Sequence, residues 1–334
     1  MPFNLGFQVY TSGFLIGLAR PLLGPTLAAI TMGLVSGHKF DTQFARNQGF
    51  NSAGNVASAL LIGLIGYRFG YRAVFLTAAF FAIPSLISLS QIDPTKIDNA
   101  LARGSTTDHR QVSPQSIWQL LQDRGLLFFL VSVFLFHLSN AAMLPQLGEL
   151  LSKGNARTAA PFMSACIIVT QLVIAAAAAW VGKKAHQSGR RPLLLLGFGV
   201  LPVRGVLYTL TKIPALLVAI QVLDGVANCI FVVVSILVIA DLTQGTGRFN
   251  LASGAMATVQ GIGAALSNAL GGLLIQRFGF NASFAGLALI GALAVSLLFW
   301  KVPETKGHTS RQPEGRNTPA FALRDLPVEE QQSD

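Results

Sequence analysis

The amino-acid sequence predicts an all-α membrane protein with about nine transmembrane helices. The chain is 52% hydrophobic and only 11% charged, and its mean hydropathy is +0.56. Soluble domains average about 25% charged residues, so this chain has too few to cover a surface that faces water. Apolar runs of about 20 residues, long enough to span a bilayer, recur along its length. A helical hairpin that occurs twice is the third indication of this fold class.

The repeated hairpin covers residues 50–79 and returns at residues 259–288. A shift of 209 positions aligns Gly54 with Gly263, Ser58 with Ser267, and the turn Arg68-Phe69-Gly70 with Arg277-Phe278-Gly279. Each copy predicts an apolar helix with Gly and Ser on one face, a tight turn and a second apolar helix. Two such copies in parallel orientation are typical of transporters built from two pseudo-symmetric bundles.

The apolar runs and the polar segments between them divide the chain. The predicted spans are residues 13–36, 49–67, 72–91, 125–146, 159–181, 192–210, 214–240, 251–276 and 281–300. Residues 92–124 form the one long polar linker, and residues 301–334 form a polar tail rich in Pro and Glu. A segment of that composition cannot bury enough apolar surface to fold, so we expect the tail to be disordered.

Lys and Arg are retained on the cytoplasmic side of a membrane, so their distribution over the loops predicts the orientation. One set of loops, together with the tail, carries 16 of them, whereas the alternate set carries 6: Arg68, Arg72, Lys153, Arg157, Lys212 and Arg277. The linker and the tail are therefore predicted to be cytoplasmic. The net charge of +10 follows from this topology. We expect no nucleic-acid partner, since no basic stripe is interleaved with aromatic residues.

Several kinds of chemical site are missing from the sequence. Both cysteines, Cys166 and Cys229, lie in apolar runs, and no CxxC pair or Cys/His cluster predicts a metal centre or a disulfide. There is no nucleotide-binding loop, nucleophile elbow or pair of carboxylates. We therefore expect no cofactor, no metal and no enzymatic activity, and transport would have to use ion or solute gradients.

Two short motifs resemble those of a known family. The segment after the fifth run reads Gly182-Lys-Lys-Ala-His-Gln-Ser-Gly189-Arg190-Arg191 and resembles the GxxxDRxGRR loop motif of the major facilitator superfamily, with His and Gln in place of Asp and Arg. The segment Val302-Pro303-Glu304-Thr305-Lys306 is similar to the PET ending of many members. The resemblance implies a gating loop formed by Gly182, Gly189, Arg190 and Arg191, and two bundles that rock around a midplane site.

The resemblance also implies a partial major-facilitator fold. Residues 1–91 would be half of the N-terminal bundle, residues 92–124 the cytoplasmic linker, residues 125–300 a complete six-helix C-terminal bundle, and residues 301–334 the cytoplasmic tail. Since the hairpin at residues 50–79 matches the family's last two helices, it should be the fifth and sixth helices. The first three helices are then expected to be missing, and we expect no transport by the 334 residues alone.

Ionisable groups inside a membrane are expensive, so each one is a candidate for function. Asp224 is the acid that lies clearly within an apolar run, and Asn228 shares its helical face. His137 lies near the middle of the fourth span with Asn140 on the same face, and a histidine titrates near neutral pH. Asn55 belongs to a polar face of the second span. For each of them the alternative is a structural role in holding helices together.

Arg204 and Asp224 are predicted to form an ion pair, because both fall at similar depth on antiparallel neighbouring helices joined by a short loop. These residues favour secondary active transport of a small molecule by alternating access, with Asp224 or His137 as a proton-coupling group. The alternative is a truncated, non-transporting or regulatory membrane protein derived from such a transporter. We expect a multi-pass protein of the plasma membrane or the bacterial inner membrane. The substrate and the oligomeric state cannot be read from the sequence.

Overall fold

The computed structural model describes residues 11, 23–35, 39–104, 122–154 and 156–306, and nearly all of these residues are helical. The predicted disordered tail beyond residue 306, residues 13–22 of the first predicted span and linker residues 105–121 lie outside the described residues. A first apolar helix covers Leu23–Leu34. The remaining elements are α2 (Phe40–Ser90), η2 (Pro94–Lys96), α3 (Asn99–Ala102), α5 (Arg124–Asn140), α6 (Met143–Gly154), α7 (Ala156–Ser188), α8 (Arg191–Leu210), α9 (Pro214–Ala219), α10 (Gln221–Thr243) and α11 (Phe249–Lys301).

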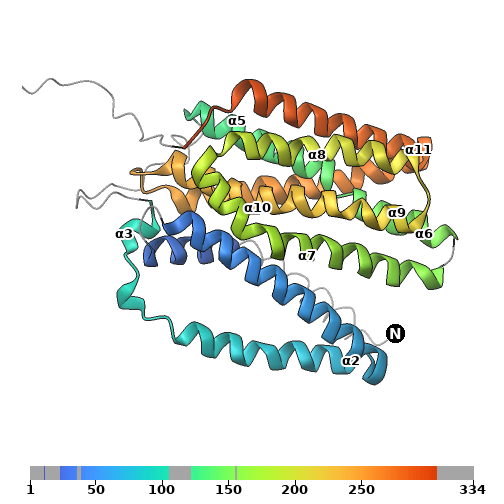
Figure 1. The fold of residues 1–334 in the computed structure, drawn as a ribbon, viewed down its shortest axis with the longest axis horizontal. Coiled ribbons are helices and arrows are strands. Elements are labelled where there is room, and N and C mark those ends of the chain that lie inside the picture. The colour runs from blue at the N-terminus through green and yellow to red at the C-terminus, as the bar shows by residue number, and fades with distance from the viewer. Residues whose placement is uncertain (1–10, 12–22, 36–38, 105–121, 155, 307–334) are drawn as a thin grey trace, which may run out of the picture.

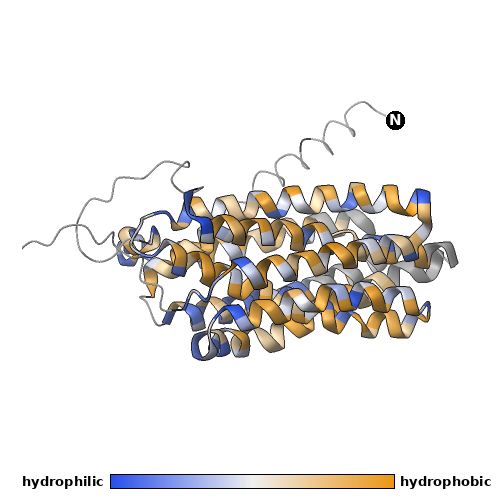
Figure 2. Ribbon diagram, turned by 90° about the horizontal axis from the view of Figure 1, so that it is seen from above, coloured by the Kyte–Doolittle hydropathy of each residue, from blue (hydrophilic) through white to orange (hydrophobic). Residues whose placement is uncertain are grey.

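Five of the described helices are long and apolar enough to cross a membrane by length and composition. They cover Arg124–Leu151, Phe162–Ser188, Arg191–Leu210, Pro214–Thr243 and Phe249–Lys301, and shorter apolar helices cover Leu23–Leu34 and Leu76–Ser90. Hydrophobic residues run along the sides of the bundle, and hydrophilic residues gather at its ends (Figure 2). This pattern is the one that a bilayer requires.

The repeated hairpin appears twice in the fold, as α2 and α11, each of which turns back on itself (Figure 1). In α11 the turn lies at Gly279, whose φ of 81° falls in the left-handed region that favours glycine. The predicted turn at Arg277-Phe278-Gly279 is thereby confirmed. At about 1.5 Å per residue, the 53 residues of α11 would be about 80 Å long if straight, far more than a bilayer of about 30 Å.

The two hairpins differ in how they pack. The first half of α11 lies against α5 through small residues: a β-carbon at Gly263 would come within 2.7 Å of the Phe134 carbonyl oxygen, and the Ser267 hydroxyl accepts a hydrogen bond of 3.0 Å from the Ala142 backbone. The first half of α2 packs on α7, where Gly182 allows close contact because a β-carbon there would lie within 2.3 Å of the Ala45 β-carbon. By contrast, residues 78–91 at the end of α2 are all exposed.

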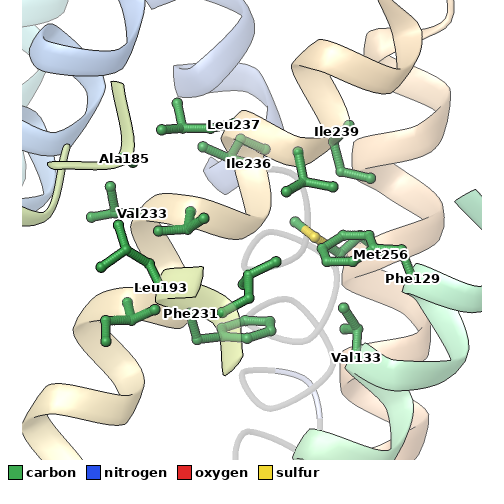
Figure 3. Packing of buried hydrophobic residues seen from close by; sticks show 14 of the residues in the cluster. Phe129, Val133, Ala185, Leu193, Phe231, Val233, Ile236, Leu237, Ile239 and Met256 are labelled. Carbon is green, nitrogen blue, oxygen red and sulfur yellow. The ribbon is translucent and has the colours of Figure 1, made fainter. Parts of the chain in front are cut away.

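Helix α10 lies at the centre of the described helices, with α7, α8 and α11 around it (Figure 1). Its side chains dominate the main buried cluster, in which Phe231, Val233, Ile236 and Ile239 meet residues of α5 and α11 such as Phe129 and Met256 (Figure 3). Because α10 is apolar around most of its circumference, any polar side chain on it must find partners inside the protein. Asp224 is such a side chain.

Two predicted boundaries are wrong. The fourth span does not end at Gln146, because that side chain is buried and accepts a hydrogen bond from Ser283, so the apolar helix continues to Leu151. The motif predicted as a loop is helical through Ser188, so only Gly189 and Arg190 separate α7 from α8. The linker contains the short helices η2 and α3, and the Asp98 backbone donates to the Gly33 carbonyl.

Candidate functional site

Arg204 of α8 and Asp224 of α10 form an ion pair inside the helical bundle, as predicted. Their exposed fractions are 1% and 7%. The Asp224 carboxylate also accepts hydrogen bonds from the Asn228 amide, at 2.9 Å to Oδ1, and from the Thr170 hydroxyl of α7, at 3.0 Å to Oδ2. Every one of these partners donates to the carboxylate.

The guanidinium of Arg204 joins this pair to α5 and α6. Its Nη2 donates to Asn140 Oδ1 and to Met143 Sδ, the latter at 3.1 Å. The Tyr208 ring lies 5.8 Å from the guanidinium carbon and receives a hydrogen bond of 2.7 Å from Gln221 on its hydroxyl. Among the described residues, Nε of Arg204 has no hydrogen-bond partner.

Four of the six predicted pathway residues therefore belong to one connected network: Arg204, Asp224, Asn140 and Asn228. The two charged residues are buried, whereas the two asparagines are only half-buried. The network therefore links the buried ion pair to two partly exposed amide side chains, Asn140 on α5 and Asn228 on α10.

His137 and Asn55 are not part of this network. The His137 Nδ1 lies 3.1 Å from the Val133 carbonyl oxygen on its own helix, and its ring meets Phe231 edge-on at 4.8 Å. Asn55 is exposed on α2 and donates to Gln171 of α7 at 3.4 Å. His137 therefore borders the aromatic core, and Asn55 lies at the contact between α2 and α7.

A second charged group, which we call the Arg190 cluster, gathers at one end of the bundle. Its members are Asp41, His186, Arg190, Asp241 and Glu304. The Arg190 guanidinium lies 2.7 Å from Asp41 and 2.9 Å from Asp241, and His186 Nδ1 lies 3.4 Å from Asp41. Burial alone would lower the pKa of Arg190, but the two carboxylates outweigh burial and raise it.

Glu304 of the PET ending closes the Arg190 cluster by capping α8. Its carboxylate accepts from the backbone N–H groups of Arg190 at 2.7 Å and of Arg191 at 3.0 Å, which are otherwise unpaired at the start of that helix. Burial would raise the pKa of Glu304, yet these and the neighbouring backbone donors lower it. The absence of a side chain at Gly189 makes space for this carboxylate, because a β-carbon there would come within 2.5 Å of it. The φ of Gly189, +96°, also lies in the region that favours glycine.

The sequence did not single out every residue of these two groups. Thr170, Tyr208 and Gln221 contact the buried pair or its partners, and each stands alone in an apolar run without a pattern that marks it. Asp41 and Asp241 lie where apolar runs meet polar segments, a position that acids often occupy for solubility. No group of His, Cys, Asp and Glu side chains in the described part of the chain could hold a metal ion.

The fold and its motifs agree with comparisons to known proteins. The family model described as Major Facilitator Superfamily matches residues 3–201 and 170–328. Uncharacterized MFS-type transporters from two strains of Mycobacterium tuberculosis are each 40% identical to this chain over 293 residues, which covers 86% of this chain and 70% of the relative. The chain therefore belongs to the Major Facilitator Superfamily of multi-pass membrane transporters, and not to an enzyme family.

Proposed function

We propose that this protein is a secondary transporter that moves a small molecule by alternating access, with Asp224 as the group that exchanges a proton and Arg204 as its counter-ion. The observation that carries the proposal is the buried Arg204–Asp224 ion pair and its hydrogen bonds to half-buried Asn140 and Asn228. A charge pair in the membrane interior is costly and is retained where a transport pathway needs it.

The proposed chemistry follows from the one-to-one charge balance of the pair. When Asp224 is ionised, it neutralises Arg204 and accepts from Thr170 and Asn228. A proton on Asp224 removes the negative charge, so the buried guanidinium needs another partner or a rearrangement of α8 against α10. Protonation thus gives the bundle two states that differ in charge, which is the requirement for coupling a proton to a conformational change.

The architecture that we propose for this mechanism has nine membrane crossings. The helix at Leu23–Leu34, the two halves of α2, α5 with α6, α7, α8, α9 with α10, and the two halves of α11 supply them. Residues 125–300 form the C-terminal bundle, and the three crossings within residues 1–91 belong to the N-terminal bundle. The 16-to-6 distribution of Lys and Arg supports a cytoplasmic position for the Arg190 cluster.

In this arrangement the Arg190 cluster acts as a contact between bundles at the cytoplasmic end. Asp41 belongs to α2, whereas Arg190, Asp241 and Glu304 belong to the segment after the linker. Rocking of α2 against α7 has to break the Asp41–Arg190 pair. Gly182, Gly189, Arg190 and Arg191 are thereby the gating residues, and Asn55, Asn140, Asn228, His137, Arg204 and Asp224 are the candidates for the pathway.

The experiment is an uptake assay in vesicles with and without an imposed pH gradient. Two forms are reconstituted: the 334-residue chain, and a chimera that adds the parts of the Mycobacterium relative outside the aligned region. A panel of small molecules is offered, and protein-free vesicles are the control. We expect the chimera to accumulate at least one compound, and to do so only when a pH gradient is present, whereas the 334-residue chain alone should show no uptake. Uptake that equals the protein-free control for both forms contradicts the proposal, and uptake without any response to the gradient contradicts proton coupling.

A further inference from the structure

The C-terminal end of α11 presents an exposed tryptophan between two positively charged side chains. Trp300 is 77% exposed. Successive residues of a helix are about 100° apart, so Phe299 and Lys301 lie on either side of it. The Arg191 guanidinium of α8 lies 5.4 Å from the Phe299 ring and donates to the Phe299 carbonyl at 2.6 Å, while the Lys301 ammonium lies 5.7 Å from the Phe128 ring of α5.

Neither cation is neutralised by a side chain within the described residues. The ion pairs of that part of the chain involve neither the Arg191 guanidinium nor the Lys301 ammonium. The carboxylate of Glu304 accepts from the Arg191 backbone and not from its guanidinium. Nε of Arg191 is buried without a hydrogen-bond partner in the same set. This end of the helix pair therefore carries two positive charges that no carboxylate of the described residues neutralises.

An apolar stripe continues from Trp300 along the outer side of α11. Leu293 and Leu289 lie 7 and 11 residues before Trp300, within about 20° of the same direction, and are 55% and 64% exposed. At about 1.5 Å per residue the stripe is about 16 Å long, the thickness of the hydrocarbon layer of one leaflet. This half of α11 lies at the outer edge of the described helices (Figure 1).

We propose that this surface, Arg191, Trp300, Lys301, Leu293 and Leu289, binds an anionic phospholipid. The two cations on either side of Trp300 attract the negative headgroup, the indole ring lies at the level of the ester groups, and one acyl chain follows the two leucines. Charge complementarity selects an anionic headgroup, because each Lys or Arg near a membrane surface attracts such lipids by about 1 kcal/mol. The apolar stripe selects a lipid over a free phosphate, which would leave the stripe uncovered. Tryptophan is enriched at this depth of a bilayer.

The internal repeat supplies a comparison within the same chain. The shift of 209 positions that superimposes the hairpins puts Ser90, Gln91 and Ile92 where the second copy has Phe299, Trp300 and Lys301. The end of α2 thus has neither the aromatic residue nor the cation. The surface is a property of the second hairpin alone and not of the repeated unit.

Quenching of tryptophan fluorescence by brominated lipids tests the proposal. Trp118→Phe and Trp180→Phe leave Trp300 as the single tryptophan of the full chain. This parent is reconstituted in phosphatidylcholine with increasing fractions of brominated phosphatidylglycerol or brominated phosphatidylcholine. We expect half-maximal quenching at a lower fraction of the anionic lipid, by on the order of fivefold for each cation engaged. Equal curves for the two lipids in the parent overturn the proposal.

Matched variants test whether Arg191 and Lys301 cause the preference for the anionic lipid. Arg191→Gln with Lys301→Gln should bring the two curves together, and Lys301→Gln alone, on an exposed side chain, should remove part of the preference without a risk to folding. Arg277→Gln, an exposed residue beside the turn of α11 at Gly279 and far along the helix from Lys301, should leave the preference intact. A preference that survives in both of the first two variants overturns the site. Inorganic phosphate in excess should not change the parent's curves, and loss of the preference on its addition overturns the assignment to a lipid.

Discussion

The two arginines associated with α8 differ in the number of acidic side chains that they contact. Arg204, within the helix, faces the single carboxylate of Asp224. Arg190, just before the helix, faces Asp41 and Asp241 from two different helices, and the tail residue Glu304 binds its backbone. Loss of one acid leaves Arg190 with another, whereas Arg204 is left with none. The comparison teaches that the Arg190 cluster is suited to hold elements together, and the Arg204–Asp224 pair is suited to switch.

The largest effect is expected from breaking the buried pair. Arg204→Ala and Asp224→Ala each leave an unpaired charge, and for buried pairs this costs about 3–5 kcal/mol, whereas removal of both can be nearly neutral. Each single variant should therefore lower the melting temperature and the monodisperse yield in detergent, and the double variant should recover much of both. A double variant as unstable as the sum of the two single variants would show that the pair is not coupled.

The Arg190 cluster should show redundancy instead. Arg190→Lys loses the planar fork that reaches both acids, and we expect a loss of about 2 kcal/mol in thermal unfolding. Asp41→Asn and Asp241→Asn should each cost less, because the other acid remains. Arg46→Lys, on an exposed residue of α2, is the matched control and should stay within about 0.5 kcal/mol of wild type. If Asp241→Asn alone lowers the free energy of unfolding as much as Arg190→Lys does, then the two acids of the Arg190 cluster do not substitute for each other.

Thr170 tests whether α7 takes part in the buried centre. Thr170→Val keeps the shape but removes the donor to Asp224, and a hydrogen bond to a charged group contributes about 1.5 kcal/mol or more. We expect the melting temperature to fall, and Thr170→Ser to restore most of it. The loss should vanish in an Asp224→Ala background, where the acceptor is absent. The same loss in both backgrounds would mean that Thr170 only packs.

The smallest effect concerns the pH dependence of the cap on α8. The pKa of Glu304 in the folded protein lies below its ordinary value of 4.5. Its carboxylate therefore contributes fully to stability above pH 4.5, and this contribution is lost as the pH falls through the folded-state pKa. Glu304→Gln should lower the free energy of unfolding by about 1 kcal/mol at pH 7. The expected loss is this small because Glu304 is partly exposed and water screens its charge. The difference from wild type should shrink as the pH falls below 4.5, and it should disappear in melting curves recorded at a pH low enough to protonate this carboxyl group in the folded protein. A difference that persists there would assign the effect to packing.

Much of the fold was readable because a bilayer imposes a simple rule on sequence. Every apolar run of sufficient length had to be a helix, so the runs at residues 192–210 and 281–300 match α8 and the second half of α11. The turn at Gly279 was readable from the repeat and from the freedom of glycine at positive φ. The Arg204–Asp224 pair was readable because two adjacent antiparallel helices each carried one charge at the same depth.

What the sequence could not give depends on side-chain partners from distant segments. Gln146 was predicted to end a span, yet its side chain is buried and accepts a hydrogen bond from Ser283, which lies 137 residues away in the sequence. His137 and Asn140 shared a predicted face, but the first meets Phe231 and the second meets Arg204. A single helical pattern cannot say which neighbour each side chain will contact. Thr170 was missed for the same reason, because a hydroxyl in an apolar run has no periodicity.

The measurement that tests the account most directly uses a paired neutral variant, Arg204→Gln with Asp224→Asn. It keeps the shape of Asp224, shortens the side chain at position 204 and removes both charges, so neither charge is left unpaired and the protein should remain folded. In the vesicle assay of the chimera, uptake of the compounds that its wild-type form accumulates should no longer respond to a pH gradient. Uptake by this folded variant that responds to the gradient as wild type does would contradict the central claim, and would leave the buried pair a purely structural one.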